Sequence, residues 1–365
     1  TLSVMLLNMF TSHGIIRHGI TFNPRISITN LGNFKHLLKS VIILNTSIQL
    51  SALIILSIKL YISQETYSEI TNIKDAIWIS FFHSVSAFNN SGFSILHQDI
   101  TWIGKDPIVI GVTMILVLLG SIGFLSLSDV FKNRSLKSLT LNTQIILAAI
   151  ITIILLGFFQ IFFTEFNNHL TLGKTNLLNK ILISGFNSYS AHTSGFTLID
   201  YSKTHLVTQL YTSITMLIGG APTSVAGGMK LTTIAITFLS IARIIQGRNK
   251  ISIWGKTISS LQVQKAFVLS ALSLFTFLIL FILMIVTHPE LSFLKLLFQT
   301  SSAFGNSGLT TTSLTEFSAY GLSILSISMI LGRVLPISIM IFINQRTSYS
   351  DDDIFQYPEE RVTIG

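Results

Sequence analysis

The chain has 365 residues, of which 49% are hydrophobic and only 10% are charged, and its mean hydropathy is +0.67. Soluble domains carry about 25% charged residues, so this composition excludes an ordinary soluble protein and indicates that much of the surface faces lipid. The absence of cysteine excludes disulfides, zinc–thiolate sites and thiol nucleophiles. The formal net charge of +8 is spread over short loops, so we expect no nucleic-acid patch.

The first residues are already apolar, and no initiator methionine or signal peptide precedes Thr1. We therefore expect residues 1–12 to be the last helix of a membrane unit whose earlier part is missing from this sequence. The remaining units should follow in chain order.

Two kinds of apolar run alternate along the rest of the chain. A spanning helix needs about 20 mainly apolar residues, whereas about 10–14 indicate a buried or re-entrant segment. Long runs lie at 41–62, 107–128, 141–163, 206–218 (resuming at 231–242), 266–286 and 320–343, and shorter runs lie at 76–88, 177–189 and 291–304.

The order of long run, short run, turn and long run occurs three times. It predicts an all-α integral membrane protein of repeated membrane helix–pore helix–membrane helix units around one central ion pore. Three complete units are preceded by the last helix of a fourth. The predicted divisions are 1–12 for that helix, 41–130, 139–243 and 262–343 for the complete units, and 344–365 for a cytoplasmic tail.

The turn after each short run carries the same motif, a Ser-Gly pair followed by a bulky apolar residue and a hydroxyl residue, recurring about 100 residues apart. Non-helical backbone at membrane depth must be buried in protein or line a watery cavity. Carbonyls of three such turns could replace part of a cation's hydration shell, and the absence of acidic residues favours K⁺ over a divalent ion. A tight turn remains the alternative for any single copy. The candidate filter residues are Asn90, Ser91, Gly92, Thr193, Ser194, Gly195, Asn306, Ser307 and Gly308.

The long run that begins at Leu206 is broken by a segment with four glycines and a proline, which cannot continue a stable helix. Because apolar residues flank both sides, we interpret the segment as a mobile loop below the filter that obstructs the permeation path. An unwound substrate site and an extramembrane loop are the alternatives. The candidate gate residues are Gly219, Gly220, Ala221, Pro222, Thr223, Ser224, Gly227, Gly228 and Lys230, with Arg333 as their partner.

Lys230 and Arg333 lie deep in apolar sequence, where ionised groups are unfavourable and commonly functional. We expect both to face the cavity beneath the filter, where they could contact loop carbonyls or form an electrostatic barrier. Snorkelling toward the cytoplasm remains an alternative for Lys230, and structural anchoring remains one for Arg333.

Several polar residues flank the turns. His83 and His192 are expected to be packed and hydrogen-bonded rather than ion-binding. Asn89, Asn90 and Asn306 are expected to brace the filter from behind.

Charge placement predicts the orientation. Residues 13–40, 129–140 and 243–265 are rich in Lys and Arg, and Asp129 is the one acidic residue among them, whereas the other connections hold more acids than bases. Because cytoplasmic loops carry the Lys/Arg excess, the turns should face outward. The tail after Ile343, which contains Asp351-Asp352-Asp353, should then be cytoplasmic.

The three turns, the 219–230 segment, Gly332-Arg333 and the ending Tyr357-Pro358-Glu359-Glu360-Arg361-Val362 together resemble the Trk/Ktr/HKT superfamily. The likeness is closest to its bacterial KtrB/TrkH-type membrane subunits, and it runs over essentially the whole chain. It implies four units around one pore, with Gly92, Gly195 and Gly308 as filter glycines, 219–230 as an intramembrane gating loop and Arg333 as its basic neighbour. The first filter is absent here, which leaves K⁺ against Na⁺ open. His192 departs from the pattern, in which Arg is common.

The resemblance further implies a K⁺ uptake subunit in a bacterial plasma membrane, with K⁺ as the transported ion and no cofactor in this chain. It also implies a homodimer and a cytosolic nucleotide-binding regulatory ring. Na⁺ or mixed Na⁺/K⁺ conduction and a non-conducting remnant remain alternatives. An intramembrane hydrolase would need Ser224 to reach a histidine such as His83, which we expect nearer the outer side.

Overall fold

The computed structural model describes residues 31–63, 67, 70–96, 104, 106–133, 135–224, 226–248 and 251–347, with side chains between residues 39 and 334. The helix predicted at 1–12 lies outside the described residues. So does the predicted tail beyond residue 347, whereas residues 344–347 continue the last helix.

The described residues are mainly helical, as the sequence predicted. The elements in chain order are α2 (Leu31–Ile62), α3 (Ile73–Phe88), α4 (Pro107–Ile122), α5 (Phe124–Lys132), η2 (Leu136–Ser138), α6 (Leu141–Glu165), α7 (Leu177–Thr193), η3 (Tyr201–Lys203), α8 (Leu206–Leu217), α9 (Leu231–Ile245), β1 (Ile251–Ile253), β2 (Lys256–Ile258), α10 (Ser260–Thr287), α11 (Phe293–Gly305), η4 (Leu314–Glu316) and α12 (Ala319–Thr347).

Polar caps fix where many of these helices begin. The side chains of Asn72, Thr140, Asn176 and Ser259 each accept a hydrogen bond from the backbone N–H three residues later, at the starts of α3, α6, α7 and α10. Such a bond satisfies one of the N–H groups that the first helical turn leaves without a partner.

Within the part of the chain that the structure describes, three helices are long and apolar enough to cross a membrane: Lys39–Ile62 within α2, α6 and α10. The pair α4 and α5 would make a fourth span if counted together. Large apolar side chains on these helices are exposed, among them Ile54 (56%), Phe159 (50%) and Phe275 (63%). An apolar surface of this kind matches a lipid environment.

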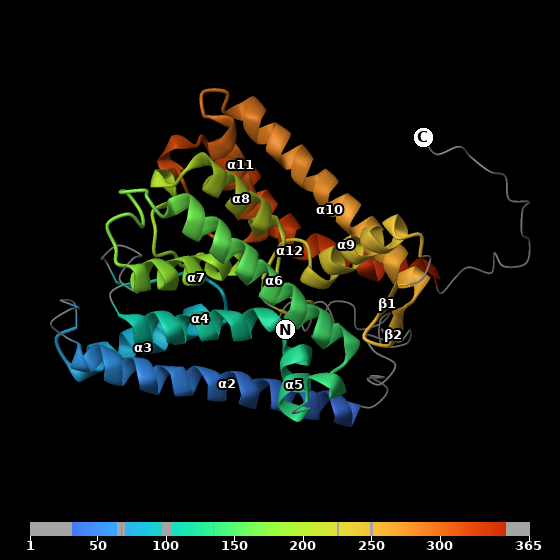
Figure 1. Cartoon of the computed structure of the whole chain (residues 1–365), viewed down its shortest axis with the longest axis horizontal. Coiled ribbons are helices and arrows are strands. Elements are labelled where there is room, and N and C mark those ends of the chain that lie inside the picture. The colour runs from blue at the N-terminus through green and yellow to red at the C-terminus, as the bar shows by residue number, and fades with distance from the viewer. Residues whose placement is uncertain are drawn as a thin grey trace, which may run out of the picture.

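The helices form three packed groups (Figure 1). The group α2, α3 and α4 lies on one side, the group α10, α11 and α12 lies on the opposite side, and α6, α7 and α8 lie between them. In each group the middle helix in chain order (α3, α7 or α11) contacts the helices before and after it. Contacts of α4 with α7 and of α8 with α11 join the groups, so the ends of the short helices meet in the interior.

The apolar run 107–128, predicted as one helix, is broken. Helix α4 ends at Ile122, and α5 continues at an angle of 104° after Gly123. Gly123 has φ 80° and ψ 143°, a backbone conformation that is essentially restricted to glycine.

A β-hairpin between α9 and α10 was not predicted. Strands β1 and β2 pair antiparallel, and Trp254 and Gly255 connect them with φ values of 49° and 76°. Two positive φ angles are typical of a tight hairpin turn. Ile251 and Ile258 pack with Ile145 of α6 in a small apolar cluster, so the hairpin covers the ends of α6 and α9.

Candidate functional site

The three Ser-Gly turns share one backbone feature. Each follows the end of a short helix, and Gly92, Gly195 and Gly308 have φ values of 70°, 73° and 89°. Side chains strongly disfavour these φ values, which explains why the motif carries glycine.

Each turn is also held by a pair of serines, one on the last turn of the short helix and one in the motif. The motif serine donates its backbone N–H to the helix serine's carbonyl, and the two hydroxyls lie within hydrogen-bond distance. The pairs, with these two distances, are Ser86 and Ser91 (3.0 and 3.2 Å), Ser190 and Ser194 (2.9 and 2.7 Å), and Ser302 and Ser307 (3.0 and 3.2 Å).

The middle turn departs from the other two. Asn90 and Asn306 precede their Ser-Gly pairs in the left-handed conformation, with φ values of 50° and 54°. At the matching place, Thr193 is the last residue of α7. The middle segment is one residue shorter between its helix serine and its motif serine, which removes the left-handed step.

The three turns lie side by side. A Cβ atom at Gly92 would collide with the Ser194 carbonyl oxygen and lie 3.4 Å from the Cα of Gly195. A Cβ atom at Gly195 would collide with the Ser307 carbonyl oxygen and lie 3.5 Å from the Cα of Gly308. At Gly308, the described residues bring no atom within 4 Å of that position. The glycines therefore follow one another, with a backbone oxygen at each junction.

Two of the three asparagines expected to brace the turns do so. The Asn306 Nδ2 donates to the Met329 carbonyl of α12 (2.9 Å). The buried Asn90 amide, in the orientation that satisfies its neighbours, donates to the Val117 carbonyl of α4 (3.2 Å). The prediction is wrong for Asn89, whose exposed amide donates back to its own helix.

Both histidines are packed and hydrogen-bonded, as expected. The buried His83 lies 2.8 Å from the Thr113 hydroxyl through Nε2, and the buried His192 donates from Nδ1 to the Thr215 carbonyl (2.9 Å). Nε2 of His83 thus pairs with Thr113, so this ring nitrogen is already engaged and does not serve a serine nucleophile.

The 219–230 segment joins α8 to α9 without forming a helix. The Met229 N–H donates to the Leu217 carbonyl (3.0 Å), and the Gly219 N–H donates to the Met229 carbonyl (2.6 Å). The Leu231 N–H donates to the Gly220 carbonyl (3.1 Å), so hydrogen bonds join the two ends of the loop.

One side of this loop packs beneath the third turn. A Cβ atom at Gly227 would lie 2.9 Å from the Gly305 carbonyl oxygen and 3.0 Å from the Cβ of Asn306. The Gly228 N–H donates to the Gly332 carbonyl of α12 (3.0 Å). The glycines at these positions allow loop, turn and helix backbones to approach closely.

The other side of the loop packs against the break between α4 and α5. The Ala221 N–H donates to the Ser121 carbonyl (3.0 Å). A Cβ atom at Gly123 would collide with the Pro222 carbonyl oxygen and lie 3.1 Å from the Thr223 hydroxyl oxygen. Thr223 itself has a φ of 67°. The loop thus lies between the break that follows α4 on one side and α11 and α12 on the other.

Lys230 turns back onto the loop, because its Nζ donates to the Ala226 carbonyl (2.7 Å). This is the expected contact with loop carbonyls, and not the snorkelling alternative. Arg333 is exposed on α12 and directly follows Gly332, whose carbonyl accepts the Gly228 N–H of the loop. Two positive charges therefore lie near the loop.

The sequence analysis missed two residues at this site. Ser121 holds the loop through its carbonyl, and its hydroxyl contacts the hydroxyl of Tyr189 on α7. Neither residue belongs to a motif, and no sequence signal pairs residues so far apart. Among the residues that the structure describes, no group of His, Asp and Glu could hold a metal ion.

Comparison with known families decides the class of protein. The family model of TrkH, described as a cation transport protein, matches residues 26–351. The chain belongs to the TrkH family. It is therefore a membrane transport protein and not an enzyme.

Individual relatives agree with this family. The chain is 30% identical to the "Ktr system potassium uptake protein B" of Bacillus subtilis, over 100% of this chain and 79% of that protein. It is 26% identical to the protein of the same name from Vibrio alginolyticus, over 100% of this chain and 78% of that one. It is 28% identical to the "Potassium/sodium uptake protein NtpJ" of Enterococcus hirae, over 79% of this chain and 64% of that protein.

The fold agrees as well. The solved potassium transporter TrkH from Vibrio parahaemolyticus superposes with a TM-score of 0.62 at 19% identity, over 82% of this chain. The match covers 63% of that solved chain, so the present chain spans less than two thirds of it. At this identity the likeness supports a TrkH fold.

Proposed function

We propose that the chain is the membrane subunit of a bacterial potassium uptake system and that K⁺ passes between the three Ser-Gly turns. The observation that carries this proposal is the side-by-side packing of Gly92, Gly195 and Gly308 with the Ser194 and Ser307 carbonyl oxygens at the junctions. Backbone oxygens of neighbouring turns, brought together in this way, can replace the water around a monovalent cation.

The electrostatics of the short helices support the same role. Helices α3, α7 and α11 all end at the turns, so their partly negative C-terminal ends point toward the turns. The candidate filter consists of Asn90, Ser91, Gly92, Thr193, Ser194, Gly195, Asn306, Ser307 and Gly308, which include no acidic residue. A dipole of this kind stabilises a single positive charge without a carboxylate.

The 219–230 loop is the proposed gate. It lies against Asn306, directly beneath the third turn, and Lys230 and Arg333 add positive charge beside it. A cation leaving the turns would meet both the loop backbone and this charge.

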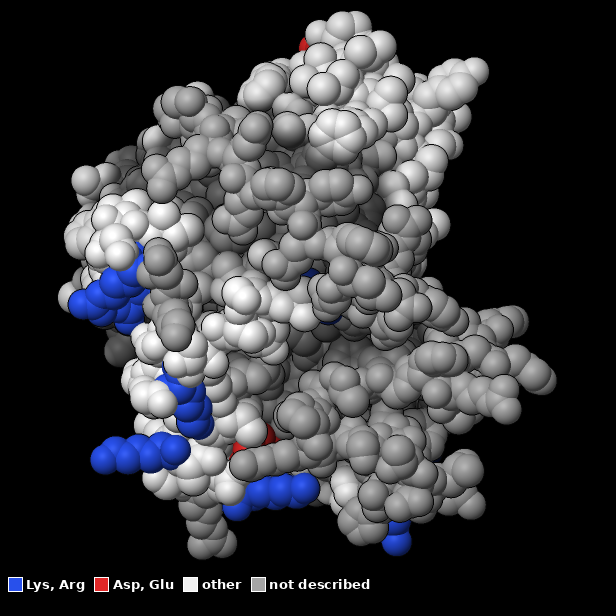
Figure 2. Space-filling model, turned by 90° about the vertical axis from the view of Figure 1, so that its right-hand side faces the viewer, with Lys and Arg blue, Asp and Glu red and all other residues white. Residues whose placement is uncertain are grey.

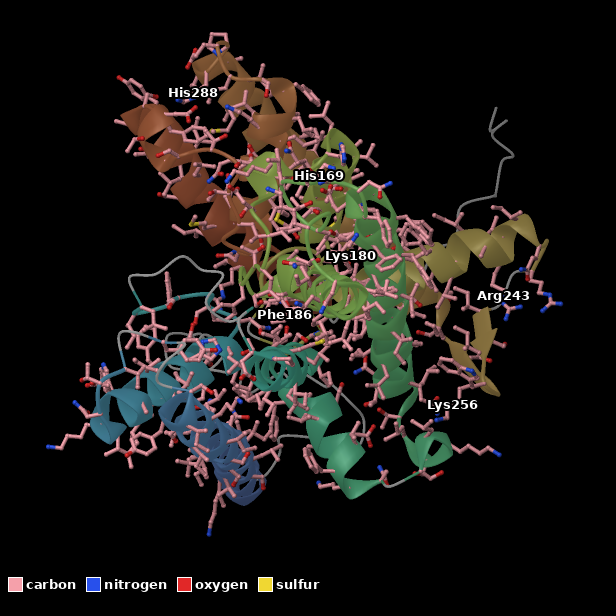
Figure 3. All side chains as sticks on the ribbon, turned by 60° about the vertical axis from the view of Figure 1, so that its left-hand side comes forward. His169, Lys180, Phe186, Arg243, Lys256 and His288 are labelled. Carbon is pink, nitrogen blue, oxygen red and sulfur yellow. The ribbon has the colours of Figure 1, made fainter. Side chains whose placement is uncertain are left out.

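The proposed arrangement is three membrane helix–pore helix–membrane helix units, at 41–130, 139–243 and 262–343, around one pore. The face of Figure 2, at the hairpin end, shows basic side chains with few acids. Arg243 and Lys256 lie at this end and His288 lies at the opposite end (Figure 3). Because Lys and Arg accumulate in cytoplasmic loops, the hairpin end is proposed to face the cytoplasm.

A homodimer and a cytosolic nucleotide-binding regulatory ring complete the proposal, as the sequence resemblance implies. The ring would meet the basic hairpin end, and the nucleotide would bind the ring. No cofactor is proposed for this chain.

The test of the filter is a substitution of Gly195 in the full-length protein. Gly195→Val introduces a side chain that collides with the Ser307 carbonyl and requires a disfavoured φ. We expect a host that lacks other K⁺ uptake to stop growing at low K⁺. Gly185→Val on α7, the helix that precedes this turn, is the control, because a Cβ there meets nothing within 4 Å. Normal growth of the Gly195 variant would remove the filter assignment.

The test of the gate is deletion of residues 219–228. We expect higher K⁺ flux in vesicles that lack the regulatory partner, because the obstruction is gone. An unchanged flux would show that the loop is no gate.

Two relatives are named for potassium uptake and one for potassium and sodium uptake. Na⁺ conduction therefore needs its own measurement. Competition of Na⁺ with ⁸⁶Rb⁺ influx in the full-length protein should be weak if K⁺ is the substrate, and equal competition would favour the mixed alternative.

A further inference from the structure

Two buried side chains near the end of α7 lie outside the Ser-Gly motif. Tyr189 and His192 are each 1% exposed, and their ring centroids are 5.4 Å apart. Both reach from the helix that bears the middle turn toward segments that hold the 219–230 loop.

Tyr189 contacts the loop through Ser121. The Ser121 hydroxyl donates to the Leu118 carbonyl (2.8 Å), so in its contact with Tyr189 the tyrosine hydroxyl is the donor. The Ser121 carbonyl accepts the Ala221 N–H (3.0 Å). One serine thus joins the middle pore helix to the loop.

His192 reaches the other end of the loop. Its Nδ1 donates to the Thr215 carbonyl (2.9 Å), and the same oxygen accepts the Ile218 N–H (3.0 Å), where the chain leaves α8 and enters the loop. The end of α7 therefore contacts both supports of the loop.

We propose that Tyr189 and His192 are positioning residues through which the middle pore helix holds the 219–230 loop in its obstructing conformation. This inference depends on the proposed gate function of the loop. The two bonds fix Ser121 and Thr215, whose carbonyls accept the Ala221 and Ile218 N–H groups. A bond that keeps such a support in place stabilises the seated loop relative to a displaced one.

The experiment removes one hydroxyl. Tyr189→Phe keeps the buried ring and deletes the donor to Ser121. A typical hydrogen bond shifts a two-state equilibrium about fivefold. We therefore expect about fivefold more K⁺ flux in vesicles without the regulatory partner, with the K⁺ over Na⁺ preference unchanged.

Ser121→Ala breaks the same contact from α4 and leaves α7 unchanged, so it should raise K⁺ flux to a similar degree. It replaces Tyr189→Phe in the test if the tyrosine variant does not fold. Tyr201→Phe is the matched control, because Tyr201 is similarly buried but lies in η3, where its ring packs against Phe298 of α11. Its flux should equal that of the unchanged protein. Unchanged or lower flux in both Tyr189→Phe and Ser121→Ala overturns the inference.

A background without the loop separates this inference from the gate proposal. If deletion of 219–228 raises flux and Tyr189→Phe adds nothing to it, the tyrosine acts through the loop, because coupled changes are non-additive. If the deletion raises flux and Tyr189→Phe raises it further, Tyr189 acts elsewhere and the inference is wrong. If the deletion has no effect, both proposals fall.

Discussion

Glu165, the last residue of α6, is fully buried yet has no basic partner among its hydrogen bonds. Its Oε2 accepts from Asn168 (2.6 Å) and Thr171 (2.8 Å), and its Oε1 accepts from the His205 N–H (2.9 Å) and Thr208. Four neutral donors compensate for the loss of water around this carboxylate. Because His205 precedes α8, the carboxylate also ties the start of that helix to the end of α6.

We predict that Glu165→Gln destabilises the protein. The amide keeps the shape but brings an NH₂ group against two of the four donors, and a buried group left without a partner costs about 1–3 kcal/mol. Thermal unfolding of the purified full-length protein should show a lower midpoint. Glu290→Gln, at an exposed site, should leave the midpoint unchanged. Equal midpoints for both variants would contradict this account.

At the scale of single residues, the positions that need a backbone conformation available to glycine could be predicted from the sequence. Gly92, Gly195 and Gly308 were found because a repeated glycine marks a place where a side chain does not fit. Ser121 could not be found, because it works through a carbonyl and a distant tyrosine. Asn89 was misjudged because it lies next to Asn90, and one residue along a turn reverses the direction of a side chain.

At the scale of helices, the break at Gly123 supports the 219–230 loop. A straight continuation of α4 would leave the Pro222–Thr223 corner without its support. Instead the chain turns by 104°, and the loop lies against the glycine. The bend and the loop are thus one packed unit.

We predict that Gly123→Ala raises K⁺ flux without the regulatory partner. The methyl group would collide with the Pro222 carbonyl oxygen, and the φ of 80° adds strain of about 1–3 kcal/mol. The loop should therefore be displaced, which ⁸⁶Rb⁺ influx into vesicles would detect. Gly111→Ala on the same helix, where a Cβ meets nothing within 4 Å, should behave like the unchanged protein. If the two variants conduct alike, the loop does not depend on this seat.

The elements themselves were predictable to different degrees. Apolar run length predicted α6 and α10 closely, because lipid sets the length of a spanning helix. The same criterion missed the bend, since a lone glycine in an apolar run is compatible with a helix. Apolar and polar residues alternate on both sides of Trp254-Gly255, a pattern that indicates a hairpin. A search for long apolar runs assigns such a short segment to a loop.

At the scale of the molecule, the two ends differ in charge. Arg243 and Lys256 lie at the hairpin end (Figure 3), and the face seen in Figure 2 shows Lys and Arg side chains with few acids. The opposite end carries the exposed pairs Lys203–Asp200 (3.0 Å) and Lys295–Glu316 (4.0 Å), in which the charges offset one another. This asymmetry is the basis of the proposed orientation.

The absence of cysteine from the sequence makes that orientation testable. We predict that Lys174→Cys reacts with a membrane-impermeant maleimide added to intact cells, whereas Lys137→Cys reacts only after the cells are permeabilised. Both lysines are exposed, so accessibility is decided by the side of the membrane. A reversed labelling pattern would falsify the proposed topology.

The spatial meeting of the turns was predicted from their repetition alone, and the structure brings them together. The order of contact could not have been predicted, because it depends on how α4 meets α7 and how α8 meets α11. Those contacts combine many weak apolar pairings that no short motif records.

Where two turns meet, the position of a carbonyl oxygen in one turn is limited by the glycine of the other turn. The Ser194 carbonyl belongs to the middle turn, yet Gly92 of the preceding turn limits how far it can move, and Gly195 limits Ser307 in the same way. In the proposed filter, a substitution in one turn can therefore shift a backbone oxygen of the next turn and change the ion preference.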